Sequence, residues 1–141
     1  MISLILFFIS GIFDAAKDII SFRYEQSVFA KLNPIFWNPL KSWKNKYRRP
    51  IIPGDKHWYY FGLYTPAMEE RFPYSTTLFV GLTDGWHLLK TMYLICTFLG
   101  VYFYKPIVGT PADFFLCWIA YSLSFNLFIE KIFNRVYWKY K

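Results

Sequence analysis

Three long runs of apolar residues dominate the pattern along this chain of 141 residues. Each run is long enough to predict a membrane-spanning helix, at about 2–24, 76–104 and 113–130. Pro106 ends the second run, because the residue before a proline disfavours the helical conformation. Asp113 is suited to capping the start of the third helix. The pattern therefore predicts an all-α, polytopic membrane protein that forms a single domain over 1–141.

Composition and charge support this interpretation. The chain is 55% hydrophobic and 24% aromatic, and only 18% of its residues are charged, against about 25% in soluble domains. No Lys or Arg precedes the first run and no small-residue cleavage site follows it, so we expect a retained helix rather than a signal peptide. The two cysteines form no CxxC pair, which argues against a disulfide scaffold.

The net charge of +7 lies mostly between the first two runs and after the third. Basic residues beside membrane spans mark the cytoplasmic face, so we expect the N-terminus outside and the C-terminus in the cytoplasm of the inner (cell) membrane. The segment 31–75 mixes Lys and Arg with aromatic residues, including Trp37 and Trp43. We interpret it as a cytoplasmic belt at the membrane surface that meets anionic lipids; the same context argues against nucleic acid.

Polar pairs inside the apolar runs are the candidate functional residues. Each pair has helical spacing that places both side chains on one face, and helix rise puts most of them roughly 8–16 Å into the cytoplasmic half, with Glu130 near the surface. Ionisable groups are costly in hydrocarbon and usually face a bundle interior. The pairs are Asp14 with Asp18, Asp84 with His87, and Asn126 with Glu130.

Carboxylates with one imidazole suit a divalent cation such as Mg, Mn or Zn, which predicts a metal site at Asp14, Asp18, Asp84 and His87. A metal there would activate water against an ester or phosphoester at the inner leaflet, with Asp84 and His87 as catalytic residues. Nearby cations would hold a phosphate group, and the remaining pair and two tryptophans would support the site. These cations are Lys17, Arg23 and Lys90; the supporting residues are Asn126, Glu130, Trp37 and Trp43.

Two other functions fit the same residues. The polar pairs could simply hold the helices together in a structural or assembly subunit of a larger membrane complex, such as a membrane-containing virion, with protein partners or as a homo-oligomer. An Asp/His chain could also pass protons or ions through an oligomer. Whether the protein is an enzyme is left open by the sequence.

The stretches NPIFWNPLKSWKNKY and TDGWHLLK resemble a group of small, uncharacterised inner-membrane proteins of Bacteroidetes-type bacteria. The resemblance covers roughly Asp14 to Lys90 and implies a bacterial or phage origin. It implies no activity, because the group has none established. It does imply that five residues form a recurring constellation: Trp37, Trp43, Asp84, Trp86 and His87.

Overall fold

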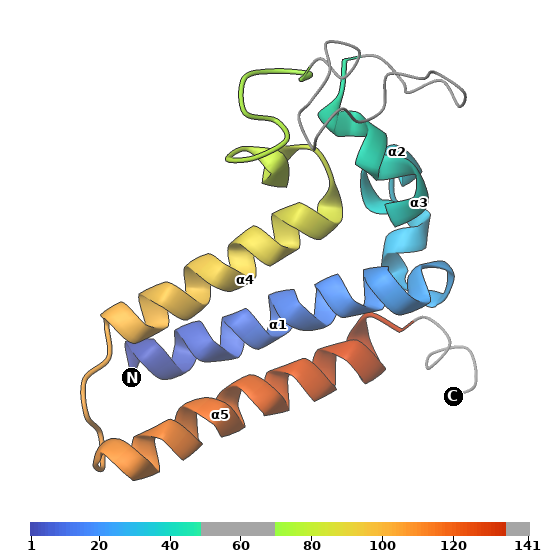
Figure 1. Ribbon diagram of the computed structural model, residues 1–141. Helices are drawn as coiled ribbons and strands as arrows, with labels where there is room; N and C mark the ends of the chain where they lie inside the picture. Colours follow the sequence, from blue (N-terminus) through green and yellow to red (C-terminus); the bar gives the residue numbers. More distant parts are fainter. Residues whose placement is uncertain (49–69, 135–141) are drawn as a thin grey trace, which may run out of the picture.

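The computed structural model describes residues 1–48 and 70–134, and helices joined by turns make up this part of the chain (Figure 1). The long helices are α1 (Ile2–Arg23), α4 (Gly85–Tyr102) and α5 (Thr110–Leu127), and two single turns form α2 (Pro34–Trp37) and α3 (Pro39–Ser42). Within the described residues the only β features are two isolated bridges. The all-α class predicted from the sequence is therefore confirmed. Residues 49–69 of the predicted aromatic-basic segment, and the basic tail after 134, lie outside the described residues.

Helix α1 lies between α4 and α5 and packs against both (Figure 1). It runs antiparallel to α4 and in the same direction as α5. At the end of the bundle where α1 stops, buried apolar residues form the core, which consists of Ala16, Ile19, Ile20, Phe29 and Leu89. Backbone pairing closes this end: Val28 N donates to Phe133 O at 2.9 Å, so the end of α5 is tied to the segment that follows α1.

Helix α1 ends within one residue of its predicted boundary, and α5 with the π turn Phe128–Ile132 covers the third predicted run. The prediction that the second helix begins near Thr76 is wrong, because α4 begins at Gly85. Residues 71–79 form turns, followed by a short 3-10 helix, Val80–Leu82, and the turns are held partly by the Glu70 carboxylate, which accepts hydrogen bonds from Tyr74 N and Thr76 N. The hydrogen bond from the Thr76 hydroxyl, together with these two backbone bonds, holds the pKa of Glu70 below its ordinary value.

The connection between α4 and α5 is organised by Asp113, which is 1% exposed. Its carboxylate accepts hydrogen bonds from Ile107 N at 2.8 Å, Val108 N at 3.0 Å and the Tyr104 hydroxyl at 2.9 Å. The prediction that Asp113 caps the start of the third helix therefore needs correction. The side chain reaches back from the first turn of α5 and satisfies the backbone of the preceding loop.

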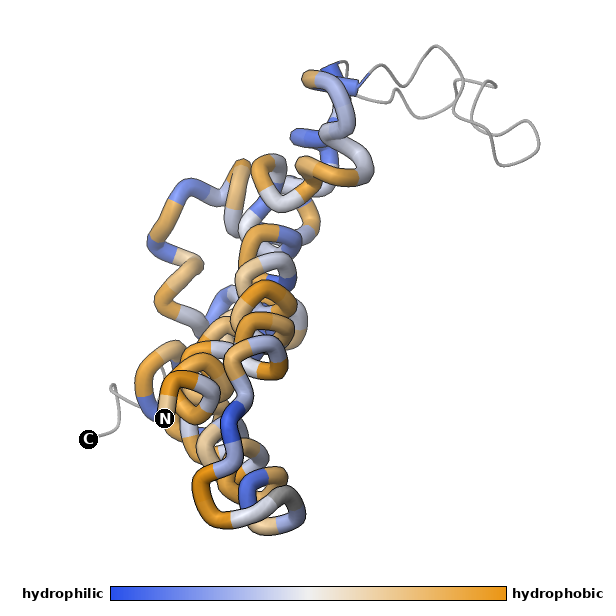
Figure 2. Tube along the Cα trace, turned by 90° about the vertical axis from the view of Figure 1, so that its left-hand side faces the viewer, coloured by the Kyte–Doolittle hydropathy of each residue, from blue (hydrophilic) through white to orange (hydrophobic). Residues whose placement is uncertain are grey.

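Large apolar side chains remain exposed along α4 and α5, and hydrophobic residues predominate along the helices (Figure 2). By length and composition, one helical stretch of the described residues, Pro111–Ile132, is apolar enough to cross a membrane, and only 17% of its apolar window is buried. Helix α1 carries three charged side chains within two turns. Helix α4 spans about 27 Å at 1.5 Å per residue and carries His87 and Lys90 in its first two turns.

Candidate functional site

Two Asn-Pro pairs build the wall of a pocket at the start of α4. Asn33 accepts a hydrogen bond from Ile35 N and Asn38 accepts one from Leu40 N, both at 2.9 Å. Each asparagine is thus an N-cap, and the proline after it occupies the first helical position, where no amide hydrogen is needed. The result is two successive one-turn helices, α2 and α3, packed beside the end of α1.

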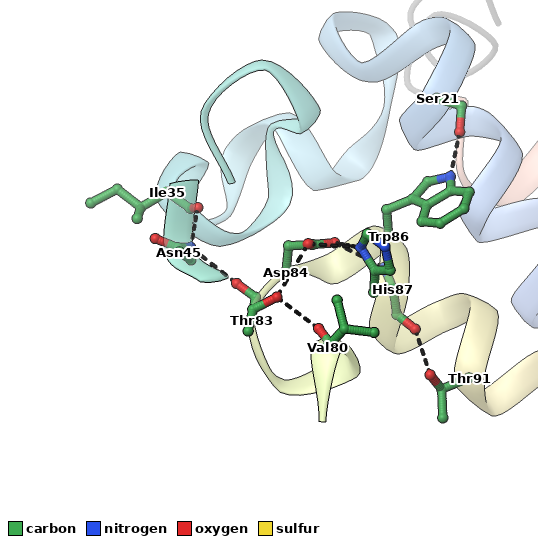
Figure 3. Close-up of polar contacts among 9 residues, drawn as sticks. All are labelled: Ser21, Ile35, Asn45, Val80, Thr83, Asp84, Trp86, His87 and Thr91. Carbon is green, nitrogen blue, oxygen red and sulfur yellow. Dashed lines mark hydrogen bonds and ion pairs between the residues drawn. The ribbon is translucent and has the colours of Figure 1, made fainter. Parts of the chain in front are cut away.

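Two contacts fasten this wall to α4. Asn45 Nδ2 donates to the carbonyls of Ile35 at 2.7 Å and Thr83 at 3.1 Å, which ties α2 to the residue before Asp84 (Figure 3). Gly85 lies directly against the ring of Trp37, and a Cβ atom at Gly85 would fall 2.4 Å from Trp37 Cε3. Only glycine therefore allows the first residue of α4 to approach the tryptophan this closely.

Asp84 and His87 form a hydrogen-bonded pair at the start of α4 (Figure 3). Asp84, 2% exposed, is the N-cap and accepts from His87 N at 2.9 Å. Its two carboxylate oxygens also lie 2.9 and 2.8 Å from His87 Nδ1. When the ring is neutral, a carboxylate at this position fixes the tautomer with hydrogen on Nδ1 and leaves Nε2 with its lone pair.

The charge on Asp84, which precedes the first residue of α4, is stabilised locally. Burial alone would raise the pKa of this carboxyl, but the hydrogen bonds from His87 and the charges of His87 and Lys46 outweigh it and hold the pKa below the ordinary 3.8. A lowered pKa means that the stabilisation is fully present above that ordinary value and is lost as the pH falls through the lower, folded value. Asp84 is therefore an anion at neutral pH.

The Asp84–His87 pair lines an open pocket of about 300 Å³. Trp86, at one side of it, donates from Nε1 to the Ser21 hydroxyl at 2.8 Å, which joins α4 to the end of α1 (Figure 3). We call this the interfacial pocket, and its lining residues are Ser21, Pro39, Ser42, Trp43, Asp84, Trp86 and His87. Four residues of the constellation implied by the resemblance line it, and Trp37 supports it through Gly85.

A second polar cluster lies within the helix bundle. Lys17 Nζ bonds Asp14 Oδ1 at 2.5 Å and lies 3.3 Å from Asp18 Oδ1. The Tyr121 hydroxyl of α5 donates to the other oxygen of Asp14, and the ring of Tyr93 on α4 lies 5.6 Å from Lys17 Nζ. All three long helices thus contribute to this cluster, which we call the bundle cluster. Its charges are paired with one another rather than open to a ligand.

The predicted site residues are therefore divided between separate places. In the described part of the chain, no three His, Cys, Asp or Glu side chains gather in a group that could hold a metal ion. The four residues predicted to bind one metal ion do not form one group in the structure. Asp14 and Asp18 pair with Lys17, whereas Asp84 and His87 pair with each other.

The remaining predicted residues have ordinary partners. Arg23 reaches Glu130 at 3.5 Å, and both side chains are about half exposed. Asn126 donates to the carbonyl of Ser122 at 2.7 Å on its own helix. Lys90 lies over the ring of Trp86, 5.0 Å from its centroid. The contacts of Asn126 and Glu130 are with Ser122 and Arg23, and neither contact reaches the Asp84–His87 pair.

Sequence reasoning missed four participants. Tyr121, which completes the bundle cluster, lies in an apolar run with no charged neighbour at helical spacing that would single it out. Ser21 and Ser42 are small polar residues common at helix ends. Asn45 could have been singled out from the sequence, because it follows two Asn-Pro turns and asparagine side chains often bond to the backbone of turns.

No family model, curated protein or solved structure matches the chain.

Proposed function

We propose that the protein is an integral membrane protein in which α1, α4 and α5 all cross the bilayer. The bundle cluster supports this for α1, because Asp14 and Lys17 are paired and turned towards the other two helices rather than towards lipid. Exposed apolar side chains support it for α4 and α5. The α4–α5 connection and the N-terminus lie at one end of the bundle, and α2, α3 and the end of α5 lie at the other (Figure 1).

We place the end with α2 and α3 in the cytoplasm of a bacterial inner membrane, following the positive-inside rule. In a background with Cys96 and Cys117 replaced by alanine, a Lys46→Cys variant should resist a membrane-impermeant thiol reagent in intact cells and react after permeabilisation. A matched Lys105→Cys variant, on the α4–α5 connection, should react in intact cells. The reverse labelling pattern would invert this orientation, and labelling of both would refute three spans.

The function that the interfacial pocket supports best is acid–base hydrolysis of an ester at the inner leaflet. The observation that carries this proposal is the Asp84–His87 pair, because a carboxylate on Nδ1 orients the ring and leaves Nε2 to take a proton. His87 would accept a proton from water as the water oxygen attacks the ester. The imidazolium would then return that proton to the departing alkoxide, giving an acid and an alcohol.

Asp84 would stabilise the positive charge that develops on His87 in this step. The divalent metal predicted from the sequence would find one available nitrogen at this pair, Nε2 of His87, since Asp84 already engages Nδ1 with both oxygens. Elemental analysis of the purified protein before and after chelator treatment tests that possibility separately. Loss of bound metal in His87→Gln would place the ion at this pocket.

A panel of chromogenic carboxylate and phosphate esters tests the hydrolase proposal in phosphatidylcholine proteoliposomes. His87→Gln should lower the rate at least about 100-fold, because general acid–base catalysis contributes that much or more. Asp84→Asn should also lower the rate while keeping α4 intact, since asparagine is itself a good N-cap. Asn126→Ala is the matched control and should leave the rate unchanged. Equal rates in all four proteins would refute the role of His87.

A non-enzymatic role is the second candidate, and the exposed apolar side chains on α4 and α5 favour it. After packing on α1, these helices still present a wide surface that another membrane helix could cover. Copurification of a stoichiometric partner in mild detergent, together with no hydrolysis of any ester, would favour an assembly subunit. Passage of protons or ions by an oligomer is a third proposal, and flux assays in the same proteoliposomes test it.

A further inference from the structure

The three cations predicted to hold a phosphate group have different surroundings. Lys17 is paired with two carboxylates and Arg23 with one. Within the described residues, Lys90 has no carboxylate partner and lies instead over the ring of Trp86, 5.0 Å from its centroid. Lys90 is therefore the one member of the predicted set whose charge is available to a ligand.

A second lysine has a matching position. Lys44 Nζ lies 5.7 Å from the ring centroid of Trp43. Trp43 and Trp86 both line the interfacial pocket, so each of its two indole side chains carries an exposed lysine on its ring. Cation–π contacts of this kind hold an ammonium group near an aromatic surface without neutralising it.

The negative charge in the pocket is already satisfied. Both oxygens of Asp84 bond to His87, and the carboxyl is 2% exposed. Lys46 adds positive charge close enough to act on Asp84. The pocket therefore has two lysines held over the indole rings that line it, together with a carboxylate that is buried and bonded, and this balance of charge favours an anionic ligand.

We propose that the interfacial pocket binds a phosphate group, held between Lys44 and Lys90 with His87 beside it. This inference rests on the proposed function and names its substrate class, a phosphate ester. The group could belong to the headgroup of an anionic lipid or to a free phosphate monoester, because both present the same oxygens to the lysines. At the surface of a membrane the two sources differ only in what the phosphate is attached to.

The test is binding, measured on the full chain in proteoliposomes. One arm follows ³¹P line broadening of short-chain phosphatidic acid added to phosphatidylcholine vesicles, and the other follows inorganic phosphate. The wild-type protein should bind in at least one arm, and Lys44→Gln and Lys90→Gln should each weaken binding roughly tenfold, as expected for one charge-assisted contact. Binding in the first arm alone assigns the site to a lipid headgroup, and binding in both assigns it to phosphate itself.

Lys131→Gln is the matched control, since it removes an exposed positive charge in the π turn that follows α5. Equal weakening by this variant would show a general charge effect and overturn the inference, as would the absence of binding in both arms. Failure of the hydrolase proposal has a different signature. If phosphate binding depends on both lysines and no ester is hydrolysed, the phosphate site stands and the hydrolase proposal fails. If neutral esters are hydrolysed and phosphate does not bind, the hydrolase proposal stands and the phosphate site fails.

Discussion

Lys17→Met should destabilise the protein by about 3–5 kcal/mol, because it leaves the carboxylates of Asp14 and Asp18 inside the helix bundle without their cation. The side chains of Lys17, Asp14 and Asp18 are 20%, 13% and 30% exposed, so water replaces the lost partner only in part. The expected measurement is the midpoint of helix loss by circular dichroism as SDS is titrated into mixed micelles. The loss should appear as a large shift towards lower SDS.

Two further variants separate the ion pair from the lysine itself. Lys90→Met removes an equivalent side chain whose contact is the Trp86 ring, and it should cost less than about 1 kcal/mol. Combining Lys17→Met with Asp14→Asn and Asp18→Asn should recover most of the loss, since no unpaired charge then remains. Equal effects of Lys17→Met and Lys90→Met would contradict a structural role for the bundle cluster.

Gly11→Ala should separate α5 from α1. A Cβ atom at Gly11 would fall 2.1 Å from the Ser124 hydroxyl and 2.5 Å from the carbonyl oxygen of Tyr121, which belongs to the backbone and cannot rotate away. Overpacking of this kind costs about 1–3 kcal/mol, although alanine in a helix interior is otherwise better than glycine by about 0.5–1 kcal/mol. The same SDS titration measures the balance, which should be clearly destabilising.

Gly100→Ala is the matched control for this substitution. Its added Cβ would meet the ring of Phe7 at 3.2 Å, which is a side chain that can shift by a few tenths of an ångström. We expect a change within about 1 kcal/mol of the parent, with the helix preference of alanine offsetting the contact. If both glycine variants moved the midpoint by the same amount, the close approach of α1 and α5 would not be what limits stability.

The helices of this protein were largely predictable, because apolar runs with a helical period have few other structures available to them. The start of α4 was not, since the apolar pattern continues upstream of Gly85 through Val80 and Leu82. What stops the helix is Asp84, whose carboxylate caps the first turn and binds His87 at the same time. The helical spacing of this pair was predicted correctly, but its place at the helix end depends on the cap.

The sequence identified several residues of the candidate site but did not predict how they are arranged in space. Spacing within a helix places Asp14 beside Asp18 and Asp84 beside His87, but it carries no information on how far apart two helices hold their pairs. Lys17 decided the outcome for the first pair, because its ammonium group lies between the two carboxylates, in the place that a metal ion would need. The pocket residues Ser42 and Pro39 come from the Asn-Pro turns, whose packing depends on contacts distant in sequence.

The central position of α1 has a consequence for biosynthesis. Helix α1 is synthesised before α4 and α5, and Tyr121, which completes the bonding of Asp14, follows Asp14 by 107 residues. Lys17 stands one turn from Asp14 on the same helix, so this pair can form as soon as α1 does. Lys17 can therefore pair with the carboxylates of α1 before α4 and α5 have packed against this helix.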